Sequence, residues 1–482
     1  MKEFWHKTGK WIFCVFLSTF PLAFSPSFVH FTLVKYSYLK FLGAAAVAAL
    51  AGATWPARGE KIRGFPLMLI PAMTAALYFL AFYGLNSDTI IFFLAGMVLA
   101  GLLYHRARRG FYPADALNLG FTFIGLGCLW IIFSDYTMAA VNAFYGHHYQ
   151  HTGLMTVIFC MVFLCLPLIC LKTEDDIQHG INALLLGGVP VAAIGVLQYL
   201  GLNLLPRGTW YFDNLFRSYS TMGNPNWFAT YLLFLLPLAL YKFLRGNSKI
   251  WLLLSALIFA SLLATLSRGA WVALACLSIC TLICFRKHYV KLALACGLCI
   301  AVVLSLLPLH NWMLLKRMAS ISRESDLAVR GKVEARIPGR GYLYSTGERI
   351  AMWKWMLKVL PKYWFKGAGL DSLPYIQGAG KAPSIKAHNI YLDLAVTMGI
   401  PGLIAYLALL FRCLFLAKGE RCFVLTMRLL LLAYLAQGAF IYDKVSTWPL
   451  LWSIMGISLA MEMVQSPSKK ALEEPVHEGC GS

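Results

Sequence analysis

The chain has 482 residues, of which 59% are hydrophobic and 13% are charged, and its formal net charge is +21. Apolar runs of 18 or more residues recur from end to end, which excludes a soluble fold and predicts an all-α polytopic membrane protein. The positive charge does not indicate nucleic acid as a partner, because in a membrane protein Lys and Arg gather in loops beside the lipid headgroups.

Apolar runs long enough to cross a bilayer predict about 14 transmembrane helices, within a range of 12–14. The expected spans cover residues 11–31, 36–54, 65–84, 88–104, 117–133, 152–171, 181–201, 227–244, 249–266, 269–285, 290–308, 390–416, 424–441 and 447–464. The chain accordingly divides into N-terminal spans at 1–180, a core with outer arginine motifs at 181–308, a large loop at 309–389, C-terminal spans at 390–464 and a tail at 465–482.

Every second loop between the expected spans is rich in Lys and Arg, and this pattern predicts how the protein is oriented in the membrane. The basic loops that fall on one side include Arg58, Arg106, Lys242, Arg286 and Lys418. We expect that side, both termini and the tail to be cytoplasmic, in a multi-pass protein of the cytoplasmic (inner) membrane. The loop at 309–389 is then extracytoplasmic, since loops of its length cross regardless of charge.

The 309–389 loop is polar and basic. From residue 310 onward it holds 14 Lys and Arg against 5 Asp and Glu, and it closes on His388. A positive surface with a titratable imidazole indicates work on an anionic substrate, although a merely solvated basic loop is the alternative.

Within this loop, residues 347–360 have helical periodicity and predict a short amphipathic helix. Its expected apolar face carries Ile350, Trp353, Leu357 and Leu360, with Arg349 in the first turn. We expect the helix to lie on the outer leaflet or to cap a cavity; a packing helix with an exposed Arg349 is the alternative.

Three expected helices begin at the outer face with polar residues. Arg217 precedes Gly223-Asn224-Pro225-Asn226, where Asn224 or Asn226 can cap the helix. Ser267-Arg268 joins two spans with too few residues for a free loop, so Arg268 lies at the outer surface, either in a site or as a snorkelling anchor. His388-Asn389 starts the next span, where His388 is either functional or a hydrogen-bonded structural residue.

The positive ends of these three helices face one headgroup layer. Together with Arg217, Arg268 and Arg349 they predict a phosphate or pyrophosphate site, because planar guanidinium groups match phosphoryl oxygens. His147, His148 and His151 form a further outer cluster, but no carboxylate or Cys pattern accompanies it, so neither a metal nor a cofactor is expected.

At these residues the chain resembles the O-antigen ligase and O-antigen polymerase family of bacterial membrane glycosyltransferases. The resemblance runs from about residue 190 to the end of the spans. It rests on the motifs around Arg217, Ser267-Arg268-Gly269, Arg349 with Trp353, Gly367-Ala368-Gly369, and His388-Asn389 with Gly399 and Gly402.

The resemblance implies a metal-independent, inverting transfer of a glycan from undecaprenyl pyrophosphate to an acceptor hydroxyl. His388 would be the catalytic base or orienting residue, and Arg217, Arg268 and Arg349 would bind the pyrophosphate. Asn224, Asn226, Ser267, Asn389 and Trp353 would support the site. The implied partners are the lipid-linked glycan donor, a glycan or lipid A-core acceptor, membrane lipids, and candidate polysaccharide assembly proteins.

One position departs from the family pattern. The family commonly has a Glu just ahead of its Gly-x-x-Gly step, where this chain has Thr397. Any carboxylate that orients the site must come from elsewhere, and Asp393 is near in sequence but off the helical face of His388. A lipid-linked oligosaccharide flippase and an anion or solute transporter are the alternative functions; they predict charges along a central path and inverted repeats, respectively.

Overall fold

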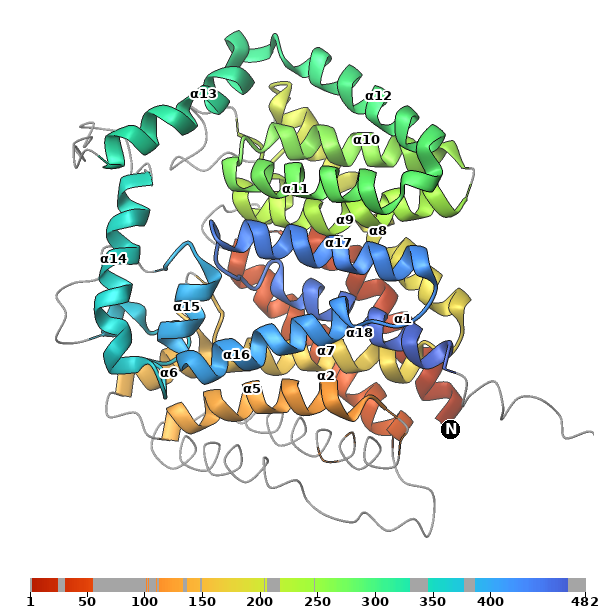
Figure 1. Cartoon of the computed structure of the whole chain (residues 1–482). Coiled ribbons are helices and arrows are strands. Elements are labelled where there is room, and N and C mark those ends of the chain that lie inside the picture. The colour runs from red at the N-terminus through yellow and green to blue at the C-terminus, as the bar shows by residue number, and fades with distance from the viewer. Residues whose placement is uncertain are drawn as a thin grey trace, which may run out of the picture.

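A computed structural model describes residues 2–24, 31–54, 101, 103, 110, 112–132, 137–147, 150–202, 204–205, 217–246, 248–329, 346–376 and 386–466. All regular elements in these residues are helical, as the composition predicts (Figure 1). The α-helices are α1 (Lys2–Thr19), α2 (Phe31–Thr54), α5 (Ala114–Ile132), α6 (Thr137–Tyr145), α7 (Leu154–Cys170), α8 (Glu174–Tyr199), α9 (Pro225–Arg245), α10 (Lys249–Ala264), α11 (Arg268–Cys284), α12 (Tyr289–Leu306), α13 (Leu309–Val329), α14 (Thr346–Tyr363), α15 (Ile390–Thr397), α16 (Gly399–Leu410), α17 (Arg421–Gly438) and α18 (Trp448–Val464).

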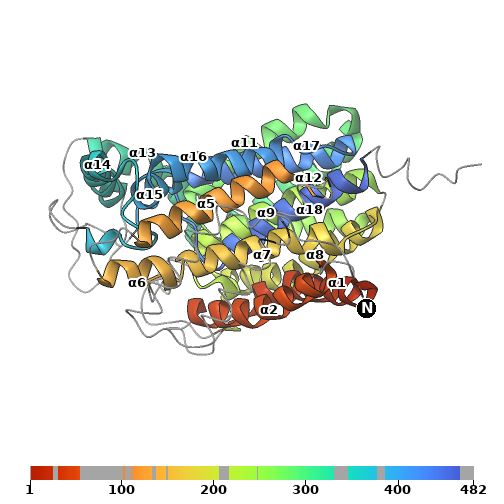
Figure 2. The ribbon, with the colours of Figure 1, turned by 90° about the horizontal axis from the view of Figure 1, so that it is seen from below.

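The long helices lie side by side in one bundle, with α7, α9 and α18 inside it (Figures 1 and 2). Every residue of α7 is buried, and α18 is buried from Trp448 to Met461. A helix that is apolar on all sides and buried on all sides belongs to the core of a bundle. In contrast, α12 is equally apolar but mostly exposed, which fits a surface that faces lipid.

Five of the described helices are long and apolar enough to cross a membrane: α2, α8, α9, the segment Arg286–Leu306 that contains α12, and α17. Shorter apolar helices occupy Ala114–Cys128, Leu154–Cys170, Lys249–Ala264, Arg268–Cys284, Gly399–Phe415 and Trp448–Val464. The predicted number of about 14 spans is therefore not confirmed. The span expected at 65–84 lies outside the described residues, and so does the span at 88–104 except for residues 101 and 103.

The span expected at 390–416 is broken. Helix α15 ends at Thr397, α16 starts at Gly399, and a π-helical turn follows at Phe411–Phe415. The break occurs because Gly399 has a left-handed backbone (φ 71°), which glycine adopts without steric cost. Residues 367–369 occupy the space that the break opens.

Helix α14 confirms the predicted amphipathic helix, but the predicted apolar face is only partly correct, because Leu360 packs against the buried cluster and Leu357 does not. Leu357 is 56% exposed, whereas Met352, Trp355, Met356 and Val359 are buried. These four residues follow an i, i+3, i+4, i+7 spacing, on a stripe that is rotated around the helix from the predicted one. They pack on Ala368, Leu373, Ala387 and Val396, so that α14 covers the segment that leads to His388.

The connections that carry the predicted site residues meet at one end of the bundle, where α14 and α15 also lie (Figure 1). The opposite end holds ion pairs of a different kind. There Arg412 donates two hydrogen bonds of 3.0 Å to the carboxylate of Glu462 and also contacts Asp115. The two ends of the helices are thus chemically distinct.

Candidate functional site

The turn that carries Arg217 is tied to the turn between α10 and α11. Arg217 donates from Nε to the carbonyl of Thr265 (3.0 Å) and from Nη2 to Oδ1 of Asn226 (3.0 Å). The hydroxyl of Ser267 donates to the same Asn226 oxygen (2.9 Å). The structure therefore brings the predicted residues Arg217, Asn226 and Ser267 into one hydrogen-bond network.

The capping of α9 resolves the alternative that the sequence left open. Asn224 is the N-cap, and its side chain accepts from the backbone N–H of Asn226 (2.8 Å). The side chain of Asn226 is thereby left to bind Arg217 and Ser267. Gly223 precedes the cap with a left-handed backbone (φ 74°), as a tight entry turn requires.

Two arginines lie at the carboxyl end of α10. The last carbonyls of a helix lack partners within the helix and form its negative end, so cationic donors are favourable there. Arg217 bonds to Thr265, and Arg317 of α13 donates from Nε to the next carbonyl, that of Leu266 (3.4 Å). The end of α10 thus gathers positive charge for a local structural reason.

The charges of three other guanidinium groups act on Arg217. Burial, and then the charges of Arg317, Arg349 and Arg268, lower the pKa of Arg217 to about 9. Arg268 is the first residue of α11, and Arg349 is in the first turn of α14. The three predicted arginines are therefore clustered, and Arg317 is a fourth member.

His388 lies beside this cluster. Burial, and then the charges of Arg349 and Lys386, lower the pKa of its imidazole to about 3. Its ring contacts Tyr442 edge to face, with 5.0 Å between ring centroids. The imidazole is accordingly neutral at physiological pH and can accept a hydrogen bond.

The backbone at His388 is unusual. Its φ of 51° is left-handed, which for a residue other than Gly costs about 1–3 kcal/mol and persists only where the surroundings enforce it. Trp353 of α14 donates from Nε1 to the carbonyl of Ala387 (2.9 Å), and Asn389 caps α15 by accepting from the N–H of Leu392 (3.0 Å). The predicted supporting residues Trp353 and Asn389 therefore hold the chain on both sides of His388.

The Gly367-Ala368-Gly369 motif fits into the break between α15 and α16. Ala368 N–H donates to Val396 O and Gly369 N–H to Thr397 O, both at 2.8 Å, so the last carbonyls of α15 gain partners. A Cβ at Gly367 would lie 2.3 Å from Thr397 O, and one at Gly399 would lie 2.2 Å from Phe365 O. Only glycine permits this backbone contact.

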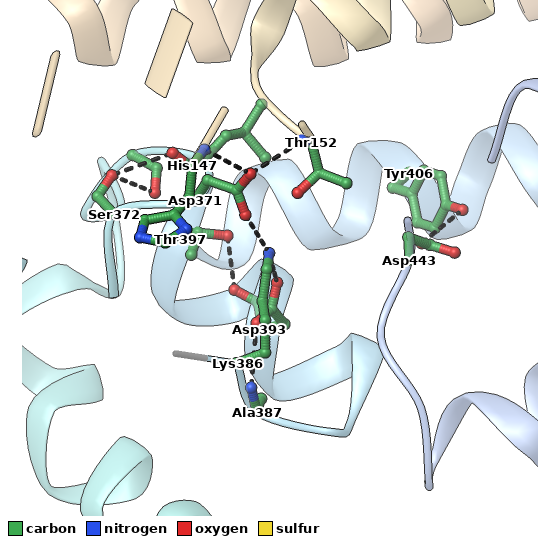
Figure 3. Close-up of polar contacts among 12 residues, drawn as sticks. His147, Thr152, Asp371, Ser372, Lys386, Ala387, Asp393, Thr397, Tyr406 and Asp443 are labelled. Atoms are coloured by element: carbon green, nitrogen blue, oxygen red, sulfur yellow. Dashed lines mark hydrogen bonds and ion pairs between the residues drawn. The ribbon is translucent and has the colours of Figure 1, made fainter. Parts of the chain in front are cut away.

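A buried ion cluster lies next to His388 in the chain (Figure 3). The Nζ of Lys386 is 2.7 Å from Oδ1 of Asp371 and 3.1 Å from Oδ2 of Asp393. Burial alone would lower the pKa of Lys386, but the two carboxylates raise it above its ordinary value. Burial would likewise raise the pKa of Asp371, but Lys386 and the hydrogen bonds from Thr152 lower it, so both groups stay ionised.

Asp443 forms a second buried carboxylate site close to this cluster. Tyr434 donates to its Oδ1 (2.8 Å), and the hydroxyl of Tyr406 is 3.2 Å from its Oδ2. Burial raises the pKa of Asp443 to about 7. Asp443, Lys386 and Asp393 line one small cavity of about 10 Å³, which has room for one water molecule.

The residues that the sequence analysis missed are Arg317, Asp371, Lys386 and Asp443. Asp371 follows the glycine motif by two residues and Lys386 precedes His388 by two, so their opposite charges beside apolar spans were the available signal. Arg317 is one of 14 cations in its segment and had no distinguishing feature. Asp393 was considered as a carboxylate for His388, but its hydrogen bonds go to Lys386 and to the backbone of Ala387.

No group of His, Cys, Asp and Glu that could hold a metal ion occurs in the part of the chain that the structure describes. His148 lies outside that part. The backbone N–H of His147 donates to Asp371 (3.0 Å), and the ring of His151 stacks on Tyr36 with 4.6 Å between centroids. These two histidines thus have structural contacts.

Residues 229–407 match the family model described as O-antigen ligase. No curated protein and no solved structure matches the chain. The matched segment contains Arg268, Arg349 and His388, which lie at one end of the apolar helical bundle. The match covers less than half of the chain, and it supports the resemblance that the sequence motifs indicated to the O-antigen ligases, membrane glycosyltransferases in general terms.

Proposed function

We propose that the chain transfers a glycan from undecaprenyl pyrophosphate to an acceptor hydroxyl at the outer face of the cytoplasmic membrane. The reaction would invert the anomeric centre and would need no metal. The observation that carries the proposal is the cluster of Arg217, Arg268, Arg317 and Arg349 beside the neutral imidazole of His388. A site of this composition suits an anionic leaving group and a hydroxyl nucleophile.

The arginines would bind the pyrophosphate. Burial is the main cause of the lowered pKa of Arg217, and the charges of the other three arginines lower it further; a bound anion of two negative charges would relieve that repulsion. Planar guanidinium forks match phosphoryl oxygens, and each charged hydrogen bond contributes about 1.5–3 kcal/mol. Hydrogen bonds from Arg217 to Asn226 and Thr265 hold its guanidinium in place before the donor arrives.

His388 would accept the proton of the acceptor hydroxyl. With a pKa of about 3 the imidazole is a weak base in the absence of donor. Because the charge of Arg349 contributes to that low value, a bound pyrophosphate should raise the pKa toward its ordinary value of about 6.5. Donor binding would thereby activate the base.

The step balances in atoms and charge. The acceptor oxygen forms a bond to the anomeric carbon while its proton passes to His388, and the bond from that carbon to the pyrophosphate oxygen breaks. The bonding electron pair leaves with undecaprenyl pyrophosphate, whose charge the arginines stabilise. Attack from the face opposite the leaving group inverts the configuration, and His388 then releases the proton to water.

A flippase and a solute transporter are less well supported. Both need polar groups along a path between the two membrane faces. In the described residues the arginine cluster lies at one end of the bundle, and α7 and α18 fill its interior with apolar side chains. This arrangement favours chemistry at a surface over passage through the protein.

The test is transfer by purified protein. We expect the protein in detergent or nanodiscs to move a labelled glycan from an undecaprenyl-pyrophosphate-linked donor to an added acceptor in excess chelator, and His388→Ala to lose about 10²–10⁴-fold in kcat. Turnover that only Mg²⁺ or Mn²⁺ restores would refute the metal-independent mechanism. A His388→Ala variant with full turnover would remove His388 from the chemistry.

The acceptor can be found from the glycans of a strain that lacks this chain. Single repeat units on the acceptor would indicate a lost polymerase, whereas full-length polymer stranded on the lipid carrier would indicate a lost ligase that serves a lipid A-core acceptor. Copurification under the same conditions would test for other polysaccharide assembly proteins as partners.

A further inference from the structure

We propose that Asp371, Lys386 and Asp393 form a positioning clamp for His388. The clamp, as we name these three side chains, would set where the imidazole lies without contacting the donor or the acceptor. The inference rests on the proposed function, because it assigns these residues to the same proton transfer.

The ionic contacts of the clamp are buried. The side chain of Lys386 is 4% exposed, that of Asp371 is 0% exposed and that of Asp393 is 10% exposed. Water screens such contacts little, so the ammonium is confined between the two carboxylates. Lys386 is two residues before His388, and its confinement therefore limits the backbone that leads to the imidazole.

Each carboxylate also binds backbone from another part of the chain. Oδ2 of Asp371 accepts from the N–H groups of His147 (3.0 Å) and Thr152 (2.9 Å), in the turn between α6 and α7. Oδ1 of Asp393 accepts from the N–H of Ala387 (3.3 Å). The clamp thus connects the glycine motif segment, the α6–α7 turn and α15 at one point (Figure 3).

The position that the clamp holds is one that the backbone does not adopt readily. His388 has a left-handed φ of 51°, and the residue before it is fixed on both sides, at N–H by Asp393 and at the carbonyl by Trp353. A side chain in such a conformation keeps its place only when its neighbours are fixed. Loss of the clamp should therefore let the imidazole move while the arginine cluster stays in place.

A general base that moves by about 1 Å loses on the order of 10²-fold in rate. We expect Lys386→Met to lower kcat by about 10- to 100-fold and to change the donor KM by less than about two-fold. The decisive measurement is a double-mutant cycle with His388→Ala. If the clamp acts only through His388, Lys386→Met should have almost no further effect on the residual rate of His388→Ala.

Two further variants distinguish a positioning effect from a general loss of folding. The double variant Lys386→Met with Asp393→Asn removes one positive and one negative charge, so it keeps the net charge of the clamp and should fold where the single variant does not. Arg412→Met breaks the partly buried contact with Glu462 at the opposite end of the bundle. Arg412→Met should lower the thermal midpoint, and its effect on rate should be the same with and without His388.

The outcomes separate the two proposals. The positioning role of the clamp would be wrong if its variants lowered the rate by the same factor with and without His388, or if they raised the donor KM. Wild-type activity in the double variant would overturn it as well. If His388→Ala itself has wild-type turnover, it is the proposed function that fails.

Discussion

Replacing Arg217 by Lys tests whether the arginines bind the donor through the planar, paired N–H donors of the guanidinium group or only through their positive charge. In the structure two different nitrogens of Arg217 are used, Nε toward Thr265 O and Nη2 toward Asn226 Oδ1. A lysine ammonium keeps the charge, but it cannot make both contacts from a fixed plane while also presenting parallel donors to a phosphate.

Loss of one charged hydrogen bond to the donor costs about 1.5–3 kcal/mol, which corresponds to about a 10- to 150-fold lower kcat/KM for the donor. Arg217→Gln should lose more, because the charge disappears as well. Both variants should raise the donor KM and lower kcat, since pyrophosphate is bound in the ground state and carries more charge in the transition state.

The assay is the initial rate of glycan transfer at varied donor concentration, with the thermal midpoint as a check on folding. Arg286→Gln is the matched control, because Arg286 lies in the turn between α11 and α12, at the other end of the bundle. A wild-type donor kcat/KM in Arg217→Lys would refute the requirement for the paired donors of a guanidinium group. A change confined to the acceptor KM would refute the assignment of Arg217 to the pyrophosphate.

Arg317→Gln should lower the donor kcat/KM by about 10-fold or more, whereas Lys316→Gln, at the exposed neighbouring position, should leave it unchanged in the same transfer assay. Because the pKa of His388 is about 3 without donor and should rise when the donor binds, profiles from pH 4 to 9 should show an acid limb in kcat and none in kcat/KM; coincident limbs would contradict the coupling. Gly367→Ala should lower the thermal midpoint and the activity together, because a Cβ would meet Thr397 O at 2.3 Å, and a variant with an unchanged midpoint would show that the contact is not tight.

The sequence predicted the parts of this protein that follow from local chemistry. Helix starts at Asn224, Ser267 and Asn389 were predicted from polar residues ahead of apolar runs, and the structure begins α9, α11 and α15 there. That these three helices start at the same end of the bundle was predicted from the alternation of basic and non-basic loops. The number of spans was less accessible, because several core helices are shorter than a bilayer requires and owe their place to packing.

Contacts between distant segments could not be predicted in the same way. The apolar face of α14 was assigned from periodicity, yet Met352 and Trp355 are buried and Leu357 is exposed, because residues 367–376 and Ala387 pack on one particular side. Periodicity establishes that a helix has an apolar side, and its partner decides which side that is.

The carboxylate of the site illustrates the same limit and explains the unusual Thr397. The hydroxyl of Thr397 donates to the carbonyl of Asp393, and the carbonyl of Thr397 accepts from the N–H of Gly369. Thr397 therefore stabilises the break between α15 and α16. Negative charge is supplied one turn earlier by Asp393 and from a distant segment by Asp371, and both act on Lys386. A carboxylate that acts through a lysine two residues from the imidazole can orient the base and still leave its pKa low, whereas one in direct contact would raise it. In the proposed mechanism the negative charge that activates His388 would therefore come from the donor, so proton transfer would depend on a bound pyrophosphate and activation of water in the empty site would be disfavoured.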